Sequence, residues 1–250
     1  MKSIQQKEAP TKNEWVDTTS SKQLVSCIMP TYNRRKFVPL AIEQFLAQDY
    51  SDKELIIIDD GKDRIMDLVP TAENIRYYYF EKRQNVGLKR NRACELANGT
   101  LIAHWDDDDW CHSRRISVQV ALLENIQTDL VGVARPYYYD MRTKTAFQYK
   151  GIPNGKWVTY LMYRKHLWQK SRYCSSRVGE DTRFISKIDK KRIHAMKDEE
   201  IGVCVIHGEN VCPKQTRNSI WRSIPVSKIE KIVEGELPNI WTGGEMKTPS

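Results

Sequence analysis

Four consecutive aspartates, Asp106–Asp109, are the residues of this sequence whose type and spacing point most directly to chemistry. Carboxylates this close repel one another, and a hard divalent cation such as Mg²⁺ or Mn²⁺ would relieve the repulsion by taking their oxygens as ligands. Asp106 and Asp108 point to the same side of an extended segment, so one could reach a ribose and the other a metal that bridges a diphosphate. The alternative is an exposed acidic loop that caps the next helix. The apolar run TLIAHW and Trp110, which flank the acids, favour a site.

Polar residues also follow two other predicted strands. Pro30-Thr31-Tyr32-Asn33 comes after the apolar run LVSCIM, and Asp59-Asp60-Gly61 ends the run ELIIID. Ligands of parallel α/β sheets bind outside the carboxyl ends of the strands, so we expect both clusters to share one crevice with the aspartates. One carboxylate of the Asp59-Asp60 pair could accept the N–H of a pyrimidine base, and Tyr32 could stack on that base. The alternatives are an ordinary Asp-Gly turn and ordinary packing.

Three segments carry weaker signals. Asn85–Arg92 begins a predicted helix, whose N-terminus favours anions, and its basic residues could contact a phosphate or form a basic surface turn. Glu180-Asp181 precedes another predicted helix, where an acidic pair is more often an N-terminal cap than a catalytic group. His207 follows the apolar run IGVCVI, and a lone histidine is more often structural than functional.

The sequence places these residues on alternating strands and helices. Predicted strands are Leu24–Met29, Glu54–Asp59, Ile75–Phe80, Thr100–Trp105 and Leu130–Ala134, and predicted helices are Lys36–Gln48, Leu88–Ala97 and Ser113–Leu123. Such alternation predicts an α/β fold with a mostly parallel sheet. The runs LVSCIM and ELIII are continuously apolar, which indicates strands covered on both faces.

The second half of the chain has less regular patterns. The expected elements are a hairpin or edge insertion over Tyr137–Tyr149, strands over Val158–Arg164 and Ile201–Ile206, a helix over Asp181–Ile188 and an amphipathic stretch over Ser227–Val233.

Composition suits a globular protein. The 250 residues are 40% hydrophobic and 10% aromatic, enough for one large α/β domain. No apolar stretch reaches the roughly 18 residues of a membrane span. Residues 1–22 are polar, lack the apolar core of a secretory signal and are predicted to be a disordered leader. The six cysteines are expected to be reduced, as in a cytoplasmic protein. The net charge of +8 would suit nucleic acid, an anionic membrane face or a phosphorylated ligand.

Five stretches in a fixed order carry a family resemblance. They are VSCIMPTYNR, ELIIIDDG, NVGLKRNRACELANGTLIAHWDDDDW, GEDTRF and IHGENVCPK, and they span about Val25 to Lys214. With these stretches in this order, the chain resembles family 2 glycosyltransferases with the GT-A fold. The resemblance implies a Rossmann-like, mostly parallel central sheet flanked by helices, with a smaller mixed C-terminal part that binds the acceptor. It also implies inverting, single-displacement transfer of a sugar from a nucleoside-diphosphate sugar, usually a UDP-sugar, to an acceptor hydroxyl with Mn²⁺ or Mg²⁺.

The resemblance also implies a role for each matching residue. The residues it assigns to the donor are Pro30, Thr31, Tyr32, Arg34, Asp60, Lys89, Arg90, Asp106 and Asp107. The first three of these line the nucleoside pocket, Asp60 binds the base, and Asp107 fills the variable middle place of a DxD motif. Asp108 is the metal ligand, and His207 is a further metal or diphosphate contact. Asp181 falls on the catalytic base.

These roles divide the chain into segments. We expect the leader at 1–22, a nucleotide-sugar-binding half at 23–135, an acceptor-binding and catalytic-base half at 136–225, and a C-terminal helix and tail at 226–250. Acceptor specificity is expected from about Arg135–Val178, whose Tyr, Trp and Lys residues suit carbohydrate stacking, a packed subdomain or a dimer contact.

The chain lacks one motif that is found in a related group of enzymes. The Q-x-x-R-W motif of processive polysaccharide synthases is absent, and Asn218–Arg222 does not match it. A single-transfer enzyme without a transmembrane segment is therefore expected, cytoplasmic or at the cytoplasmic membrane face, with a homodimer as a further expectation.

Two alternatives remain at this point. A sugar nucleotidyltransferase would share the α/β plan and the metal, but it should carry a Gly-rich loop after the first strand, and MPTYNRRKF has no glycine. A basic nucleic-acid-binding module would explain the charge and would bind oligonucleotides in a salt-sensitive way, but it leaves the aspartate run without a purpose. We therefore expect no nucleic-acid partner.

Overall fold

The computed structural model describes residues 23–151, 157–197, 200–212, 214 and 216–243. The predicted leader, residues 1–22, lies outside the described residues, and so do residues 244–250 of the predicted tail. Within the described ranges, no helix has both the length and the apolar character needed to cross a membrane.

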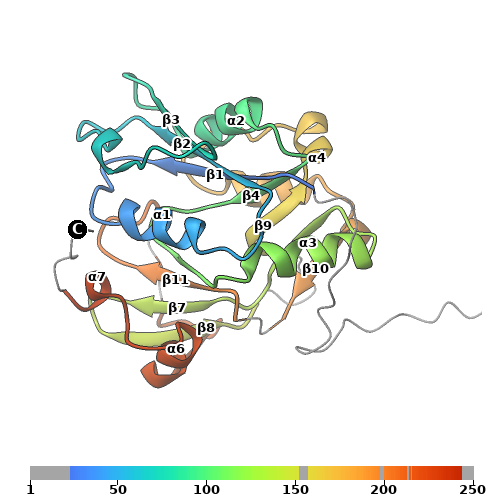
Figure 1. The fold of residues 1–250 in the computed structure, drawn as a ribbon. Coiled ribbons are helices and arrows are strands. Elements are labelled where there is room, and N and C mark those ends of the chain that lie inside the picture. The colour runs from blue at the N-terminus through green and yellow to red at the C-terminus, as the bar shows by residue number, and fades with distance from the viewer. Residues whose placement is uncertain (1–22, 152–156, 198–199, 213, 215, 244–250) are drawn as a thin grey trace, which may run out of the picture.

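A seven-stranded sheet forms the centre of the fold (Figure 1). Its strands are β1 (Val25–Thr31), β2 (Lys53–Asp59), β3 (Ile75–Tyr79), β4 (Leu101–His104), β6 (Leu130–Val133), β9 (Thr159–Arg164) and β10 (Ile193–Met196). They lie in the order β10-β6-β9-β4-β1-β2-β3. β9 runs antiparallel to its two neighbours, β4 and β6, and the other pairs are parallel. The predicted α/β class with a mostly parallel central sheet is confirmed.

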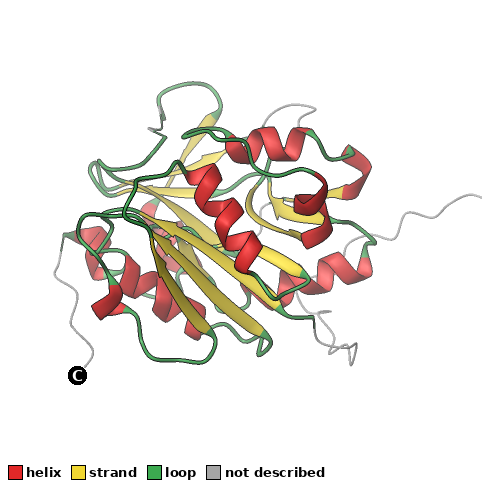
Figure 2. Cartoon of the chain, turned by 90° about the horizontal axis from the view of Figure 1, so that it is seen from above, coloured by secondary structure: helices red, strands yellow, loops and turns green. Residues whose placement is uncertain are grey.

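Helices cover both faces of this sheet, as Figures 1 and 2 show. They are α1 (Val38–Leu46), α2 (Val86–Leu96), α3 (Arg115–Asn125), α4 (Lys165–Lys170) and α5 (Glu180–Ser186). In β1, Cys27 and Met29 are packed with α1 and α3, whereas Ile28 is packed with α2, α4 and α5. The continuous apolar runs seen in the sequence are therefore buried on both sides, as predicted.

Strand register brings the predicted polar clusters to one edge of the sheet. Thr31 pairs with Asp59, so β1 and β2 end side by side. Ile28 pairs with His104, and the Trp105 N–H donates to the Ile28 carbonyl at 3.0 Å. The chain that leaves β4 therefore reaches the aspartates beside the end of β1.

A second sheet of five strands packs on the α1 and α3 side of the first. Its strands are β5 (Trp110–Cys111), β7 (Tyr137–Asp140), β8 (Thr145–Tyr149), β11 (Gly202–Ile206) and β12 (Trp221–Ile224), in the order β12-β8-β7-β11-β5. Its outer face is covered by α6 (Val226–Ile232) and α7 (Asn239–Thr242). The antiparallel pair β7–β8 confirms the predicted hairpin.

Several short elements were not predicted from the sequence. α4 has six residues, and β10 and β12 have four each, so none is long enough to show a hydrophobic period. The predicted boundary at residue 135 falls between β6 and β7, yet the first sheet takes β9 and β10 from beyond it.

The buried carboxylate of Glu54 joins three strands near their amino ends. It accepts hydrogen bonds from the Ser26 hydroxyl of β1 at 2.6 Å, from Arg76 of β3 at 2.6 Å and from the Asn98 N–H at 2.7 Å. Burial alone would raise the pKa of Glu54, but these hydrogen bonds outweigh it and lower the pKa below its usual value. The lowered pKa means that the ionised form stabilises the fold above the pKa of the unfolded chain, and that this stability is lost as the pH falls through the folded pKa.

We predict that Glu54→Gln lowers the free energy of unfolding at pH 7 by about 1.5–3 kcal/mol, the range for hydrogen bonds to a charged group. The gap between variant and wild type should narrow below about pH 4.3, where the unfolded carboxyl binds a proton. Urea titrations at pH 7 and in the acid range measure both effects, with the exposed Glu73→Gln as the control. Equal stability of Glu54→Gln and wild type at pH 7 would contradict the assignment.

Candidate active site

A cleft of about 910 Å³ lies between the carboxyl ends of β1 and β4 and the second sheet. Its volume is within the roughly 300–1,000 Å³ of small-molecule sites. The predicted site residues that line it are Pro30, Thr31, Tyr32, Arg34, Lys89, Arg90, Asp106, Asp107, Asp108 and Asp181. Asp60 and His207 are not part of the lining, but each contacts a residue that is, Lys89 and Asp108 respectively.

The aspartate run is the crossing between the two sheets. Asp106 follows β4 of the first sheet by two residues, and Asp109 directly precedes β5 of the second. β5 pairs with β11, which ends at Ile206, so the crossing lies next to the segment that carries His207.

Arg90 of α2 connects the first of these aspartates to the start of α5. Its Nη2 donates to Asp106 at 2.9 Å, and its Nη1 pairs with Glu180. Burial alone would lower the pKa of Arg90, but the two carboxylates more than reverse this and raise it, so the guanidinium stays charged. Because Glu180 directly precedes Asp181, these ion pairs fix Asp181 relative to Asp106.

The first turn of α2 is fitted closely to the segment that leads into α5. Asn85 caps the helix, because its side chain accepts the Leu88 N–H at 3.0 Å, and its amide donates to Ser175 at 2.8 Å. A Cβ at Gly87 would lie 2.1 Å from the Cys174 carbonyl oxygen, so only glycine allows this approach. Arg90 is thereby held one turn further along a fixed helix.

Lys89 and Asp60 form a buried pair behind the wall of the cleft. The Lys89 ammonium donates to the Thr31 carbonyl and to Asp60, both at 2.7 Å, and the Asp60 side chain is fully buried. Neighbouring Asp59 accepts the Gly61 N–H at 2.8 Å, the geometry of an Asp-Gly turn. The contact of Asp60 with a base stays a prediction.

Tyr32 presents its ring at the cleft. The Arg83 guanidinium lies over this ring, 3.9 Å from its centroid. The Arg83 guanidinium is therefore stacked on the ring on which a base is predicted to stack. Base stacking on Tyr32 stays a prediction.

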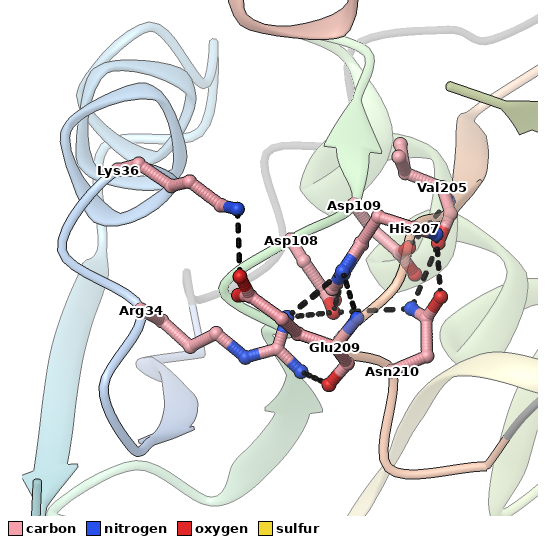
Figure 3. Close-up of polar contacts among 8 residues, drawn as sticks. All are labelled: Arg34, Lys36, Asp108, Asp109, Val205, His207, Glu209 and Asn210. Atoms are coloured by element: carbon pink, nitrogen blue, oxygen red, sulfur yellow. Dashed lines mark hydrogen bonds and ion pairs between the residues drawn. The ribbon is translucent and has the colours of Figure 1, made fainter. Parts of the chain in front are cut away.

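Asp108 and His207 meet although they lie far apart in the sequence (Figure 3). His207 Nε2 is 2.9 Å from Asp108 Oδ2. Arg34 Nη1 is 3.4 Å from the same oxygen and 2.8 Å from Nε2. A carboxylate oxygen, an imidazole nitrogen and a guanidinium thus converge on one point of the cleft.

Polar contacts hold the His207 ring in place. The Glu209 N–H lies 3.1 Å from Nδ1, and Nε2 lies between Asp108 Oδ2 at 2.9 Å and Arg34 Nη1 at 2.8 Å. The charge of Asp108 holds the Arg34 guanidinium beside the ring. The Asn210 side chain accepts the His207 N–H at 2.6 Å and fixes the turn.

The Asp108–His207 pair fits a divalent metal. Carboxylate oxygen and imidazole nitrogen are ligands that Mn²⁺ accepts, and Mg²⁺ usually takes one or two carboxylates with substrate phosphates and water. In the part of the chain that the structure describes, no three His, Cys, Asp or Glu side chains converge as a metal site. Phosphate oxygens and water would have to complete the coordination. Arg34 shows that this point already attracts positive charge.

Asp107 and Asp109 also line the cleft, Asp107 as a buried residue and Asp109 as a partly buried one. Asp109 accepts the Val205 N–H at 2.9 Å. Burial, followed by the charge of Asp108, raises the pKa of both carboxyls, that of Asp107 to about 7. Among the described residues, Asp107 Oδ2, Thr31 Oγ1 and Arg90 Nε are buried without a hydrogen-bond partner, and all three residues line the cleft. These atoms are groups that a polar ligand can satisfy.

Asp181 lies in the first turn of α5 and is partly exposed to the cleft. Its Oδ1 accepts the Thr182 N–H at 2.6 Å. Gly179 precedes the helix with φ of 74°, a left-handed conformation that glycine adopts freely, and so turns the chain sharply into α5. The structure therefore brings Asp181 into one cleft with the aspartate run, although its role stays a prediction.

Several residues of the cleft were missed by the sequence analysis as site residues. Glu180 was assigned only a capping role from the sequence, because its partner Arg90 lies 90 positions away. Asn210 stands in the stretch IHGENVCPK, so this motif was the one available signal for it. Tyr138 and Trp157 line the cleft from the second sheet and the segment before β9.

Comparison with known families identifies the chain. Residues 26–188, more than half of its length, match the model described as Glycosyl transferase family 2. The chain belongs to this family.

Curated relatives of this family 2 chain include glycosyltransferases of bacterial polysaccharide assembly. It is 35% identical over 119 residues to a protein of *Escherichia coli* K12 named for colanic acid biosynthesis, the glycosyl transferase WcaA, with 46% of this chain and 43% of that protein covered. It is 31% identical over 120 residues to the *Escherichia coli* UDP-Glc:alpha-D-GlcNAc-diphosphoundecaprenol beta-1,3-glucosyltransferase WfaP, with 47% of each covered. The chain thus spans less than half of the length of these relatives.

Solved structures confirm the GT-A fold of this family 2 chain. *S. aureus* TarS 1-349 in complex with UDP-GlcNAc aligns with a TM-score of 0.61 at 19% identity, covering 75% of this chain and 60% of that one. The mannosyltransferase PcManGT from *Pyrobaculum calidifontis*, in complex with GDP-Man and Mn²⁺, aligns with a TM-score of 0.60 at 16% identity, covering 78% and 59%.

We predict that Gly87→Ala in this family 2 chain lowers the free energy of unfolding by about 1–3 kcal/mol, because the added methyl group overpacks the contact with Cys174. Urea denaturation measures the change. The control is Gly235→Ala, where an added Cβ meets no atom within 4 Å. The close approach of α2 to the Cys174 segment would be refuted if the two variants lost equal stability.

Proposed function

We propose that this chain transfers a sugar from a nucleoside-diphosphate sugar, a UDP-sugar, to an acceptor hydroxyl by an inverting single displacement. The observation that carries the proposal is one cleft lined by Asp106 and Asp108 from the sheet crossing and by Asp181 from α5. Membership of glycosyl transferase family 2 supports the same activity. WfaP and WfgD are named as UDP-Glc enzymes, which favours UDP as the nucleotide.

The donor occupies the β1 side of the cleft in this proposal. Pro30, Thr31 and Tyr32 line the nucleoside pocket, with Asp60 and Lys89 forming the wall behind it. Asp106 reaches the ribose, with Asp107 beside it. The buried Thr31 hydroxyl, Asp107 carboxylate and Arg90 Nε lack partners among the described residues, and a bound nucleotide sugar would supply them.

Asp108 and His207 would hold the metal, Mn²⁺ or Mg²⁺, in this proposal. A bound divalent cation would supply Lewis-acid stabilisation of negative charge on the departing diphosphate. Arg34, which lies 3.4 Å from Asp108, would pair with a phosphate oxygen when the metal takes its present position. Arg90 adds a second fixed positive charge beside Asp106.

Asp181 is the general base of the proposed reaction. Its carboxylate takes the proton of the acceptor hydroxyl as that oxygen forms its bond to the anomeric carbon. The bond between the anomeric carbon and the diphosphate oxygen breaks at the same time, and the nucleoside diphosphate leaves with the electron pair. Attack on the face opposite the leaving group inverts the anomeric centre. The Arg90–Glu180 pair keeps Asp181 in place for this step.

The acceptor is proposed to be a carbohydrate hydroxyl. The names of WfaP and WfgD specify an acceptor linked to diphosphoundecaprenol, a lipid carrier. These names support a carbohydrate acceptor that the chain meets at the cytoplasmic membrane face.

Hydrolysis of a panel of nucleotide sugars tests the function. With Mn²⁺ or Mg²⁺ we expect slow release of the nucleoside diphosphate from one donor, and loss of that release in chelator.

Asp108→Asn should weaken metal-dependent UDP binding in calorimetry at least about tenfold, because even changes beside metal ligands cost 10–100-fold. The exposed Asp63→Asn is the matched control. Unchanged metal-dependent binding by Asp108→Asn would overturn the metal site, and failure of every donor would overturn the activity.

We predict that Asp181→Asn lowers transfer by about 10²–10⁴-fold, the usual contribution of a general base. Binding of UDP with Mn²⁺ should stay within twofold of wild type, because Asp181 is assigned to the acceptor and not to the nucleotide. Transfer is measured by release of the nucleoside diphosphate in the presence of acceptor, and binding by calorimetry. Near-normal transfer by Asp181→Asn would remove it from this role.

A further inference from the structure

A second, smaller hollow opens beside the cleft. It has a volume of about 280 Å³ and is lined by Tyr138, Tyr149, Trp157, Lys214, Asn218, Ile220 and Trp221. Tyr138, Trp157 and Lys214 also line the main cleft, so the two spaces adjoin. We call this hollow the aromatic pocket. Its strand residues come from the second sheet, whereas the nucleoside residues Pro30–Tyr32 come from the end of β1.

The rings of the aromatic pocket are held at fixed angles by one another. Trp221 packs edge-to-face against Tyr138, with ring centroids 4.8 Å apart, and against Tyr149 at 5.3 Å. Tyr149 in turn meets Trp157 at 5.2 Å and 72°. Trp221 and Tyr149 are also paired across β12 and β8. Such packing fixes the ring planes before any ligand arrives, which reduces the ordering that binding would require.

Two of these four rings keep an exposed surface despite the packing. Tyr138 and Tyr149 are buried, but Trp157 and Trp221 remain partly exposed, and Ile220 beside them is 39% exposed. No described residue accepts a hydrogen bond from the indole N–H of Trp157 or Trp221. The pocket therefore offers flat apolar faces together with N–H donors, the amide of Asn218 and the ammonium of Lys214.

We propose that the aromatic pocket binds a pyranose ring of the acceptor, which makes the acceptor a glycan with a ring seated beyond the reacting hydroxyl. This inference rests on the proposed function. A pyranose has an apolar C–H face and a rim of hydroxyls, and rigid aromatic planes bordered by a few polar groups match both parts. Because the pocket and the cleft adjoin, one ring can occupy the pocket while the next ring presents its hydroxyl in the cleft.

Simple packing is the competing explanation. Rings that only fill a core are covered on all sides, as Trp105 and Trp241 are at 0% and 1% exposure. Trp157 and Trp221 instead border an open volume, and Trp157 also lines the adjoining candidate active site. The packing explanation predicts no selectivity for sugar rings at this place, and a binding measurement separates the two.

Saturation-transfer NMR on the full chain tests the inference with named probes. The methyl glycosides of glucose, galactose, mannose and N-acetylglucosamine are compared with sorbitol, an acyclic polyol of similar polarity, and with UDP plus the diamagnetic Mg²⁺. We expect at least one glycoside to receive saturation mainly on its C–H face, at least fivefold above sorbitol. Trp157→Ala and Trp221→Ala should each reduce that signal at least fivefold, and Trp221→Phe, which keeps a ring, should reduce it less.

The control variant is Tyr79→Ala, which removes a partly exposed ring from β3, outside both pocket linings. It should leave the glycoside signal unchanged. The UDP signal reports the proposed function separately, and it should persist in every variant. The inference is overturned if UDP binds but no glycoside exceeds sorbitol, or if Trp157→Ala and Trp221→Ala leave the glycoside signal intact. Loss of UDP binding in the wild type would instead overturn the proposed function. Should Trp221→Ala not fold, Trp157→Ala and Trp221→Phe decide the matter.

Discussion

Repulsion among four successive carboxylates is the constraint around which the cleft is arranged. Neighbouring carboxylates raise each other's pKa unless each finds a different environment. The fold provides four environments along Asp106–Asp109: a guanidinium from α2 for the first, a buried position for the second, an imidazole and a second guanidinium for the third, and a backbone N–H of β11 for the fourth. Because these groups come from distant parts of the chain, the aspartates acquire these partners only in the folded protein.

The position of this run between the two sheets gives the cleft its chemistry. β4 and β5, which flank it, belong to different sheets, so groups from both sheets and from the helices between them converge there. Polar residues at the edge of the first sheet and aromatic residues of the second sheet line the cleft from opposite sides. Such a division of surface suits the proposed binding of a charged nucleotide and a largely uncharged sugar.

The fold was more predictable than the site. The runs that became β1 and β2 are apolar on both faces, and this strong local signal located both strands within about two residues. Glu180 gave no such signal, because its importance depends on Arg90, 90 positions earlier. The same holds for Trp221, whose pairing with Tyr149 joins β12 to β8 across an irregular segment. Composition and hydrophobic periodicity report local structure. These contacts, in contrast, exist only after folding has brought distant parts of the chain together.

The place of β9 determines how this chain can be divided. Its hydrogen bonds join β4 to β6, and β10 then covers the outer edge of β6. A fragment that stopped at residue 135 would leave two strands of an apolar sheet with unpaired edges, which are templates for association with other chains. The predicted nucleotide-sugar-binding half, residues 23–135, is therefore not a transferable module. A chimera that exchanges acceptor regions between relatives would have to keep β9 and β10 with the first sheet and take only the hairpin β7–β8 and the strands that pair with it.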